Sequence, residues 1–465
     1  MTTTRLLRSG LLVLALTALL SCGGGGSGSV SGFGIPGSAG GSQNGALTGS
    51  SGTTTAGSAD GSGGSTTAGS ADGSSGGTTV GTTDGSGNGS TSTASNGDGS
   101  GVGSGGTGVT SASAVGVGSV DGFGSVIVNG LRYDIDSAVV TLEDAQELAI
   151  GMTARVIGAV DAGFTSGVAR ELSSAAELRG PLTAVDPSTG NLLVMGTTVT
   201  TDSTTVWADT LRMSSLGAGA TLQIWGLPVS PGVLRATRIA QVAGAAAPIV
   251  TGTVQNLDMA ARVFNVGGLV VDYRSAAFAG GQNAATLANG AIVRVRATQA
   301  PAGGVLTASV VQSWYGHAST AGTVALLEGV ISEYTGVGGF KILDTPVDAS
   351  AAKITGGPGA SALGNGVKVI VGGTFDSNGR LLATTLKIRH VPGTGGPASF
   401  MLIGTVGYYT SSASFQVRGK PVDASGSDVD FVNGSAADLR NGTKVTVSGS
   451  QVMDGVLIAT QVIFD

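Results

Sequence analysis

Residues 117–465 alternate short apolar and polar runs with glycine-rich turns. Alternation with a period of two is typical of strands that bury one face, so the pattern predicts β-strands along this whole region. One glycine that precedes an alternating strand returns at steps of 68 to 76 residues, at Gly151, Gly219, Gly290, Gly366 and Gly442. This spacing predicts five tandem copies of one unit.

Within each unit the strands follow a fixed order. A strand around a glycine and a second strand that reaches a tight turn are followed by a third strand, which ends at Asp134, Thr200, Asp272, Asp348 or Asp423. A polar stretch with helical character then leads to two further strands. Five strands with a short helix between the third and the fourth predict a small closed barrel of OB-like type. We expect each unit to contact only its neighbours in the chain, because the joins are short.

The predicted fold class is therefore all-β, with five tandem small OB-like β-barrel repeats at residues 117–176, 177–245, 246–316, 317–396 and 397–465. They follow a Gly/Ser/Thr-rich segment, residues 23–116, which holds 33 of the 83 glycines but only four charged residues. Such a segment cannot bury enough apolar surface to offset its ordering entropy, so we expect a disordered tether. Its repeated TTAGSADGS motif is compatible with a calcium-binding β-roll but lacks the large apolar residues of such a core.

Residues 1–22 have the pattern of a secretory signal peptide. Arg5 and Arg8 precede an apolar run of about ten residues, which is too short to span a bilayer of roughly 30 Å. The following stretch, Leu19-Leu20-Ser21-Cys22, resembles a bacterial lipobox, and Cys22 is the single cysteine of the chain. We therefore expect an exported protein that is lipid-anchored through Cys22, at the outer membrane or cell surface of a bacterium. An ordinary signal peptide with an incidental cysteine is the alternative.

The order of motifs within a unit is GxV…FxVxGxxVD…LxxGxxVxVxG…GxLxAxxV. It resembles the repeats of bacterial exported lipoproteins that are catalogued as domain of unknown function 5666. The resemblance covers residues 117–465 and implies small β-barrel repeats on secreted or lipid-anchored proteins, without an agreed activity. Two units depart from the pattern, because unit 2 has Thr200 in place of the aspartate and unit 4 has Leu343-Asp344 in the turn that elsewhere holds a glycine.

Charge and composition exclude several classes of protein. The formal net charge is −6, whereas a nucleic-acid binder needs a basic footprint, so we expect no nucleic-acid partner. One cysteine excludes a disulfide scaffold, and two distant histidines, His317 and His390, give no obvious metal site. The chain has no spacing typical of nucleophilic or zinc catalysis. We therefore predict no catalytic residues, no cofactor and no metal site.

Acidic side chains are weak candidates for a site. The aspartates that end the third strands are the only polar residues repeated in register, and we interpret them as Asx-turn acceptors rather than ligand contacts. One carboxylate in each barrel is too few for calcium, which takes six to eight oxygens. Glu143, Asp144 and Glu147 form an acidic cluster that we interpret as a solvated helical face.

Aromatic side chains are the remaining candidates. Trp225 lies in an alternating strand and is expected in the core. Trp207, Trp314 and Tyr315 are possible ligand contacts, because exposed aromatics on OB-like barrels can stack on sugars, although packing between units is the favoured interpretation.

The favoured hypothesis is a lipid-anchored, non-enzymatic envelope or surface protein whose barrels form a stalk or an interaction array, with envelope polysaccharide or protein as a possible partner. The alternative is a carbohydrate- or peptide-binding module. Three aromatics exposed along one groove would favour this alternative, and buried ones would weaken it.

Overall fold

The computed structural model describes residues 112–244, 246–315, 320–393, 396 and 400–465. Within these ranges all the regular elements are β-strands, apart from three single-turn 3-10 helices. No helix among these residues has the length and apolar character needed to cross a membrane. The predicted signal peptide, Cys22 and the predicted tether up to residue 111 lie outside the described residues. The first strand begins at Ala112, so residues 112–116 belong to a strand rather than to the tether.

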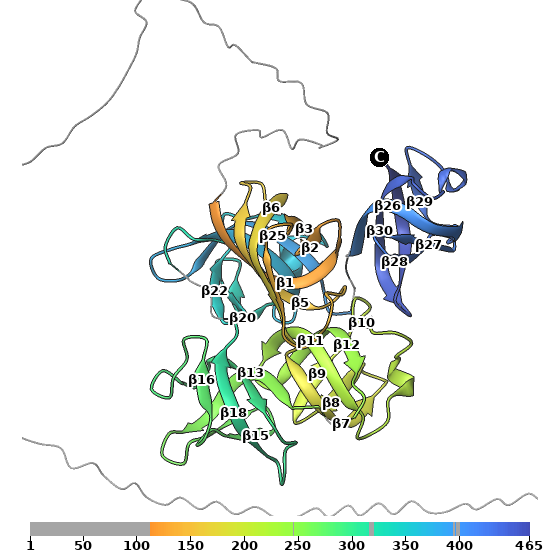
Figure 1. Ribbon diagram of the computed structural model, residues 1–465. Helices are drawn as coiled ribbons and strands as arrows, with labels where there is room; N and C mark the ends of the chain where they lie inside the picture. Colours follow the sequence, from red (N-terminus) through yellow and green to blue (C-terminus); the bar gives the residue numbers. More distant parts are fainter. Residues whose placement is uncertain (1–111, 245, 316–319, 394–395, 397–399) are drawn as a thin grey trace, which may run out of the picture. The chain divides into compact units, whose positions relative to one another are not determined.

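The strands group into five repeats (Figure 1). Repeat 1 contains β1 (Ala112–Phe123), β2 (Val126–Val128), β3 (Leu131–Asp134), β4 (Val139–Leu142), β5 (Thr153–Val160) and β6 (Ser166–Ser174). Repeat 2 contains β7 (Leu178–Asp186), β8 (Asn191–Val194), β9 (Thr197–Thr200), β10 (Val206–Trp207), β11 (Thr221–Ser230) and β12 (Val233–Gln241). Repeat 3 contains β13 (Ile249–Asp258), β14 (Val263–Val266), β15 (Leu269–Asp272), β16 (Ala277–Ala279), β17 (Ile292–Ala297) and β18 (Val305–Ser313).

Repeat 4 contains β19 (Val324–Val330), β20 (Ser332–Gly336), β21 (Gly339–Ile342), β22 (Thr345–Asp348), β23 (Lys353–Thr355), β24 (Lys368–Phe375) and β25 (Leu381–His390). Repeat 5 contains β26 (Phe400–Ser411), β27 (Ser414–Val417), β28 (Lys420–Asp423), β29 (Asp430–Val432), β30 (Lys444–Met453) and β31 (Val456–Phe464). All five third strands therefore end at the residues that the sequence predicts.

One order of strand pairing is common to all five repeats. In repeat 1, β1 pairs with β2 and β5, β2 pairs with β3, and β5 pairs with β6, all antiparallel. The ring closes because β3 runs parallel to β6. The same pairs occur in the other repeats, with the first strand of repeat 4 divided into β19 and β20. A closed ring of strands leaves few free backbone groups at a sheet edge.

The predicted helix between the third and fourth strands is wrong. This segment instead forms a short extra strand, β4 in repeat 1, which runs parallel to β6. In repeats 2, 4 and 5 a 3-10 turn follows the extra strand, at Met213–Ser215, Ala360–Ala362 and Ala436–Asp438. The reason is the length of the last strand: β3 pairs only with its first three residues, and β4 pairs with the backbone groups that remain.

The recurring glycine adopts the backbone conformation that its position predicts. Gly151, Gly219, Gly290, Gly366 and Gly442 have φ values of 86°, 85°, 92°, 88° and 91°. In repeat 5, the Gly442 N–H donates to the Val406 carbonyl, and the Val406 N–H donates to the Thr443 carbonyl. This pair of hydrogen bonds joins the turn to the first strand of the same repeat, and a residue with a Cβ is strained at such φ values.

First strands also pair between repeats. β2 pairs with β1 only from Val120 onward. The residues of β1 before Val120 therefore leave this edge free for another strand. Residues Ala114–Val117 of β1 pair there in parallel with Val324–Leu327 of β19. β7 and β13 pair in the same region of repeats 2 and 3, and the end of β1 pairs with β26. The expectation that each repeat contacts only its neighbours in the chain is therefore wrong.

Hydrophobic cores cross the same boundaries. Repeats 2 and 3 share one buried cluster, which includes Leu222 and Phe264. Trp225 of repeat 2 is buried in the core of repeat 1, which confirms its predicted core position but places it in another repeat's core. Val206 of repeat 2 likewise packs in the core of repeat 5. The repeats are therefore joined by apolar packing as well as by strand pairing.

Candidate functional site

Fully buried charges lie between the repeats. Only 11% of the residues are charged, yet Glu177, Arg294 and Glu328 have no exposed surface. A buried charge is costly unless an opposite charge and hydrogen bonds compensate it. These residues lie in two groups, which we call the Glu177 cluster and the Glu328 cluster.

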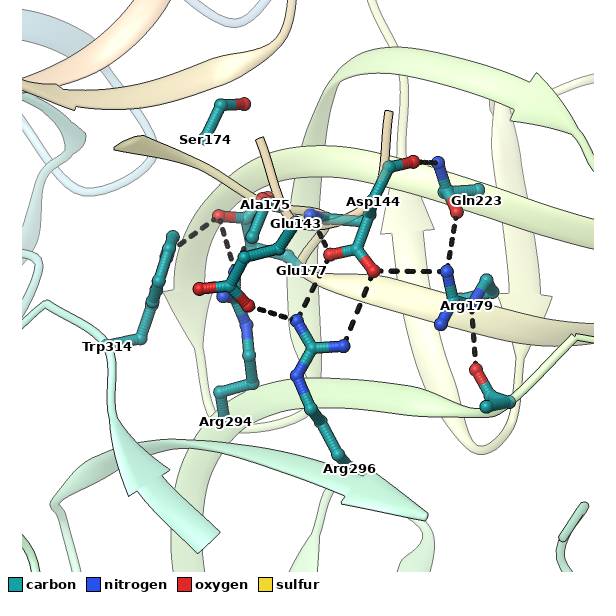
Figure 2. A network of polar contacts seen from close by, with 12 residues as sticks. Glu143, Asp144, Ser174, Ala175, Glu177, Arg179, Gln223, Arg294, Arg296 and Trp314 are labelled. Atoms are coloured by element: carbon teal, nitrogen blue, oxygen red, sulfur yellow. Dashed lines mark hydrogen bonds and ion pairs between the residues drawn. The ribbon is translucent and has the colours of Figure 1, made fainter. Parts of the chain in front are cut away.

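The Glu177 cluster joins repeats 1, 2 and 3 (Figure 2). Glu177 immediately precedes β7 and accepts hydrogen bonds from the Thr153 hydroxyl of β5 and from the Gly226 N–H of β11. Its Oε1 also accepts from the Trp314 indole and the Tyr315 hydroxyl of repeat 3. A carboxylate can accept about four hydrogen bonds, so these protein groups occupy most of its capacity.

Arg294 is the cation of the Glu177 cluster. Its Nη2 lies 3.7 Å from Oε1 of Glu177 and donates to the Ala175 carbonyl. The guanidinium stacks 3.3 Å from the centre of the Trp314 ring, a cation–π geometry. Burial raises the pKa of Glu177 and lowers the pKa of Arg294, since it disfavours both charged forms.

The acidic residues after β4 extend this cluster. Asp144 lies between Arg179 of repeat 2, at 3.1 Å, and Arg296 of repeat 3, at 3.2 Å, and its side chain is only 2% exposed. Arg296 also pairs with Glu143. Figure 2 shows both guanidinium groups reaching the Asp144 carboxylate. The interpretation of this stretch as a solvated helical face is wrong: it is not helical, and the side chain of its central acid, Asp144, is buried between two arginines, although Glu143 and Glu147 remain exposed to solvent.

The Glu328 cluster joins repeats 1 and 4. Glu328 of β19 accepts hydrogen bonds from the backbone and hydroxyl of Ser119 in β1, both at 2.6 Å, and its Oε1 lies 3.0 Å from Nζ of Lys368. Beside it, Asp121 of β1 pairs with Arg389 of β25 at 2.9 Å. Two acids thus meet two bases where the first strands of repeats 1 and 4 pair.

The two acids of the Glu328 cluster respond differently to their surroundings. Burial raises the pKa of Asp121 to about 6, against the opposing effect of the Arg389 charge. Burial acts in the same direction on Glu328, but Lys368 and Arg389 outweigh it and hold its pKa below the ordinary value. The charges at this interface therefore depend on one another.

Sequence reasoning missed these clusters. Their signal was a charge within an apolar strand, as in the run Leu326-Leu327-Glu328-Gly329 and in the alternating run from Val293 to Arg296. Alternation predicts that Arg294 faces away from the core of its own repeat. In the structure another repeat covers that face.

The repeated aspartates act as Asx-turn acceptors. Asp134, Asp272, Asp348 and Asp423 each accept a hydrogen bond from the backbone N–H two residues later, at distances of 2.9 to 3.1 Å. This agrees with the structural interpretation of these residues and explains why they recur at one position.

The three candidate aromatics do not lie together. Tyr315 is 6% exposed and Trp314 is half-buried, and both side chains belong to the Glu177 cluster. Trp207 of β10 packs against the core of repeats 2 and 3 and lines a separate groove of about 410 Å³. His390 is buried, with Nδ1 3.8 Å from Asp202, and burial lowers its pKa, while His317 lies outside the described residues.

Cavities large enough for a small molecule lie where repeats meet. One of about 600 Å³ is lined by residues of repeats 2, 3 and 4, including Pro228, Ile292, Leu343 and the Lys341–Asp344 pair. The groove beside Trp207, which we call the Trp207 groove, is a second cavity of this kind. Within the ranges that the structure describes, no three His, Cys, Asp or Glu side chains are grouped to hold a metal ion.

The molecule is thus an all-β protein built from tandem copies of one closed ring of strands, with buried ion pairs between copies. The family described as Domain of unknown function (DUF5666) matches residues 179–240, 251–312, 328–387 and 404–463, which is more than half of the chain. The chain belongs to this family, with four tandem copies of its domain. Repeat 1 lies outside the matched residues, although its strands pair in the same order. No curated protein matches the chain.

Proposed function

We propose that the chain is a lipid-anchored, non-enzymatic envelope or surface protein whose OB-like repeats form an interaction array. The observation that supports this best is the pair of buried charged clusters between repeats. A buried ion pair is weak evidence for stability, and its best-attested use is to fix one arrangement of the parts that it joins. Here such an arrangement would present several repeats to a partner in a defined relation.

The strand order supports the assignment of an OB-like barrel to each repeat. Five main strands close a ring in which the third and last strands are parallel. OB-folds are small five-stranded barrels that bind ligands through one sheet face and its loops. In this proposal the repeats serve as binding modules rather than as parts of one catalytic domain.

The chemistry of the clusters supports a role without catalysis. A general acid or base must reach a substrate proton within hydrogen-bond distance. Glu177 and Glu328 instead hydrogen-bond protein groups and have no exposed surface. They are placed to hold repeats together.

The net charge of −6 supports a partner other than nucleic acid, such as envelope polysaccharide or protein. The alternative role, carbohydrate or peptide binding through three exposed aromatics, is weakened by the burial of Tyr315. The groove beside Trp207 is the observation that favours carbohydrate binding.

Membrane fractionation of a Cys22→Ser variant tests the anchor. Because Cys22 is the single cysteine, this variant has no acylation point and should move to the soluble fraction after a carbonate wash. Ser21→Ala is the matched control, since it keeps a small residue before Cys22 and should stay with the membrane. A Cys22→Ser protein that remains with the membrane would contradict the proposal.

A further inference from the structure

The Trp207 groove lies between repeats 2 and 5. From repeat 2 it is lined by Asp202, Ser203, Trp207 and Arg212, and from repeat 5 by Gln451 and Asp454. Its volume of about 410 Å³ is within the range of about 300–1,000 Å³ that is typical of small-molecule sites. Apart from its aromatic ring, the groove offers hydroxyl, amide, carboxylate and guanidinium groups.

Trp207 combines an apolar ring with an unused donor. Trp207 pairs with Ile239 in the last strand of repeat 2. The residues at the matching position of the other repeats are Val140, Phe278, Ile354 and Phe431. Those four side chains fill the position without a polar group. The Trp207 indole N–H makes no hydrogen bond with any other described residue, so its donor is free for a ligand.

Gln451 and Ser203 add further free polar groups. Both side chains are exposed, and neither forms a hydrogen bond with another described residue. A primary amide presents two donors and an acceptor, and a hydroxyl presents both functions. These groups complement a ligand that carries neighbouring hydroxyls.

The charged side chains of the groove are already paired. Asp202 binds Arg235 at 2.8 Å, and Asp454 binds Arg212 at 2.6 Å across the two repeats. Each of the two acids that line the groove has its own arginine partner, so no unpaired charge is left to attract an anion or a cation. Electrostatic complementarity therefore favours a neutral ligand over a phosphate or a uronic acid.

We propose that the Trp207 groove binds a neutral saccharide. One apolar face of a sugar ring packs on the indole, and its hydroxyls hydrogen-bond Ser203 and Gln451. The Trp207 N–H, which lies in the plane of the indole, donates to a hydroxyl of an adjoining sugar at the edge of the ring. The Arg212–Asp454 pair links the two repeats at the groove and offers charged hydrogen-bond partners to further hydroxyls. This names the partner class of the proposed envelope protein, and so rests on that proposal, but the groove does not depend on the lipid anchor.

The experiment uses the detergent-solubilised full chain on an array of neutral, acidic and amino-sugar oligosaccharides, followed by titration calorimetry with the strongest neutral binder. Trp207→Phe fills the position as Phe278 and Phe431 do in other repeats, and removes the N–H donor together with part of the stacking surface, so affinity should fall at least about 2- to 12-fold. Trp207→Ala and Gln451→Ala should each also weaken binding, the first by about tenfold or more.

Tyr408→Ala is the matched control, because Tyr408 is an 80% exposed aromatic of repeat 5 that does not line the groove. It should bind as the unaltered chain does, and circular dichroism of each variant confirms its fold. Binding of no neutral glycan, binding only of acidic glycans or peptides, or unchanged affinity in both Trp207→Phe and Gln451→Ala would each overturn the proposal. Cys22→Ser fractionation is a separate result, so failure of the anchor and failure of the site are distinguishable.

Discussion

Repeats 4 and 5 have the same strand pairing but very different surroundings. In repeat 4, Glu328 precedes the glycine of the first strand and Lys368 lies two residues after Gly366, and the two side chains form a buried ion pair. The matching positions of repeat 5 hold Ile403 and Lys444. Lys444 is exposed and forms no ion pair with another described residue.

The difference follows from what covers each first strand. Four residues of β19 pair with β1, whereas only Met401 and Leu402 of β26 do so. The same position on one fold can thus hold a solvated lysine or a buried one, depending on the neighbouring repeat. We infer that repeats 1 to 4 unfold as one cooperative block and that repeat 5 opens separately.

The largest expected effect comes from breaking the buried ion pair between Lys368 and Glu328. Lys368→Met leaves Glu328 buried without its principal counter-charge, and should lower the free energy of unfolding by about 3–5 kcal/mol. Lys444→Met, the same change at the matching exposed position, should alter it by no more than about 0.5 kcal/mol. Denaturant titration of both variants measures the difference, and equal effects would show that the two positions are equivalent.

The second prediction uses the raised pKa of Asp121. Its carboxyl has a pKa of about 6 in the folded protein and an ordinary value of 3.8, so the folded state holds the proton more tightly. The stabilisation that this carboxyl contributes to the folded state is fully present below about pH 4, and it is lost as the pH rises toward about 6. Across that pH window, the free energy of unfolding of the unaltered chain should fall by up to about 3 kcal/mol relative to that of Asp121→Asn.

The test measures the free energy of unfolding of both proteins from about pH 3.5 to about pH 8, so that the whole window is covered. Groups remote from Asp121 cancel in the difference, whereas Glu328, whose titration is coupled to that of Asp121, contributes to it. A difference that stays constant, or that grows in favour of the unaltered chain as the pH rises, would contradict the assigned environment of Asp121.

The smallest effect should stay within repeat 5. Gly442 has a φ of 91° and open space where a Cβ would lie, so Gly442→Val introduces backbone strain of about 1–2 kcal/mol or more without a clash. Gly407→Val is the matched control, because Gly407 also has open space around it but no positive φ. Hydrogen exchange should show lost protection in repeat 5 for Gly442→Val alone. Equal loss in both variants, or loss that spreads to repeats 1 to 4, would contradict the separate opening of repeat 5.

Much of each repeat could be predicted from the sequence. Alternation located the strands, Asp134 and its counterparts marked the ends of the third strands, and the spacing of Gly442 and its counterparts located the turns with positive φ. These features depend on residues close together in one unit. The short strand β4 was missed because only its pairing with β6 distinguishes it from a polar loop.

The charged clusters could not be predicted in the same way. Arg294 and Glu328 lie on strand faces that a single unit would leave to solvent, and they become buried only because another repeat covers them. Nothing in the local pattern states which open strand edges will pair. The Trp207 groove has the same origin, because Gln451 and Asp454 come from a repeat more than 200 residues away.

Native-state hydrogen exchange at increasing denaturant, followed by mass spectrometry, tests cooperative opening of the repeats most directly. Amides of β1 and β24, on the two sides of the Glu328 cluster, should exchange with one free energy and one denaturant dependence, and those of β30 should exchange at lower denaturant. Opening of β24 while β1 remains protected, or one common transition for all five repeats, would contradict the cooperative block of repeats 1 to 4 and the separate opening of repeat 5.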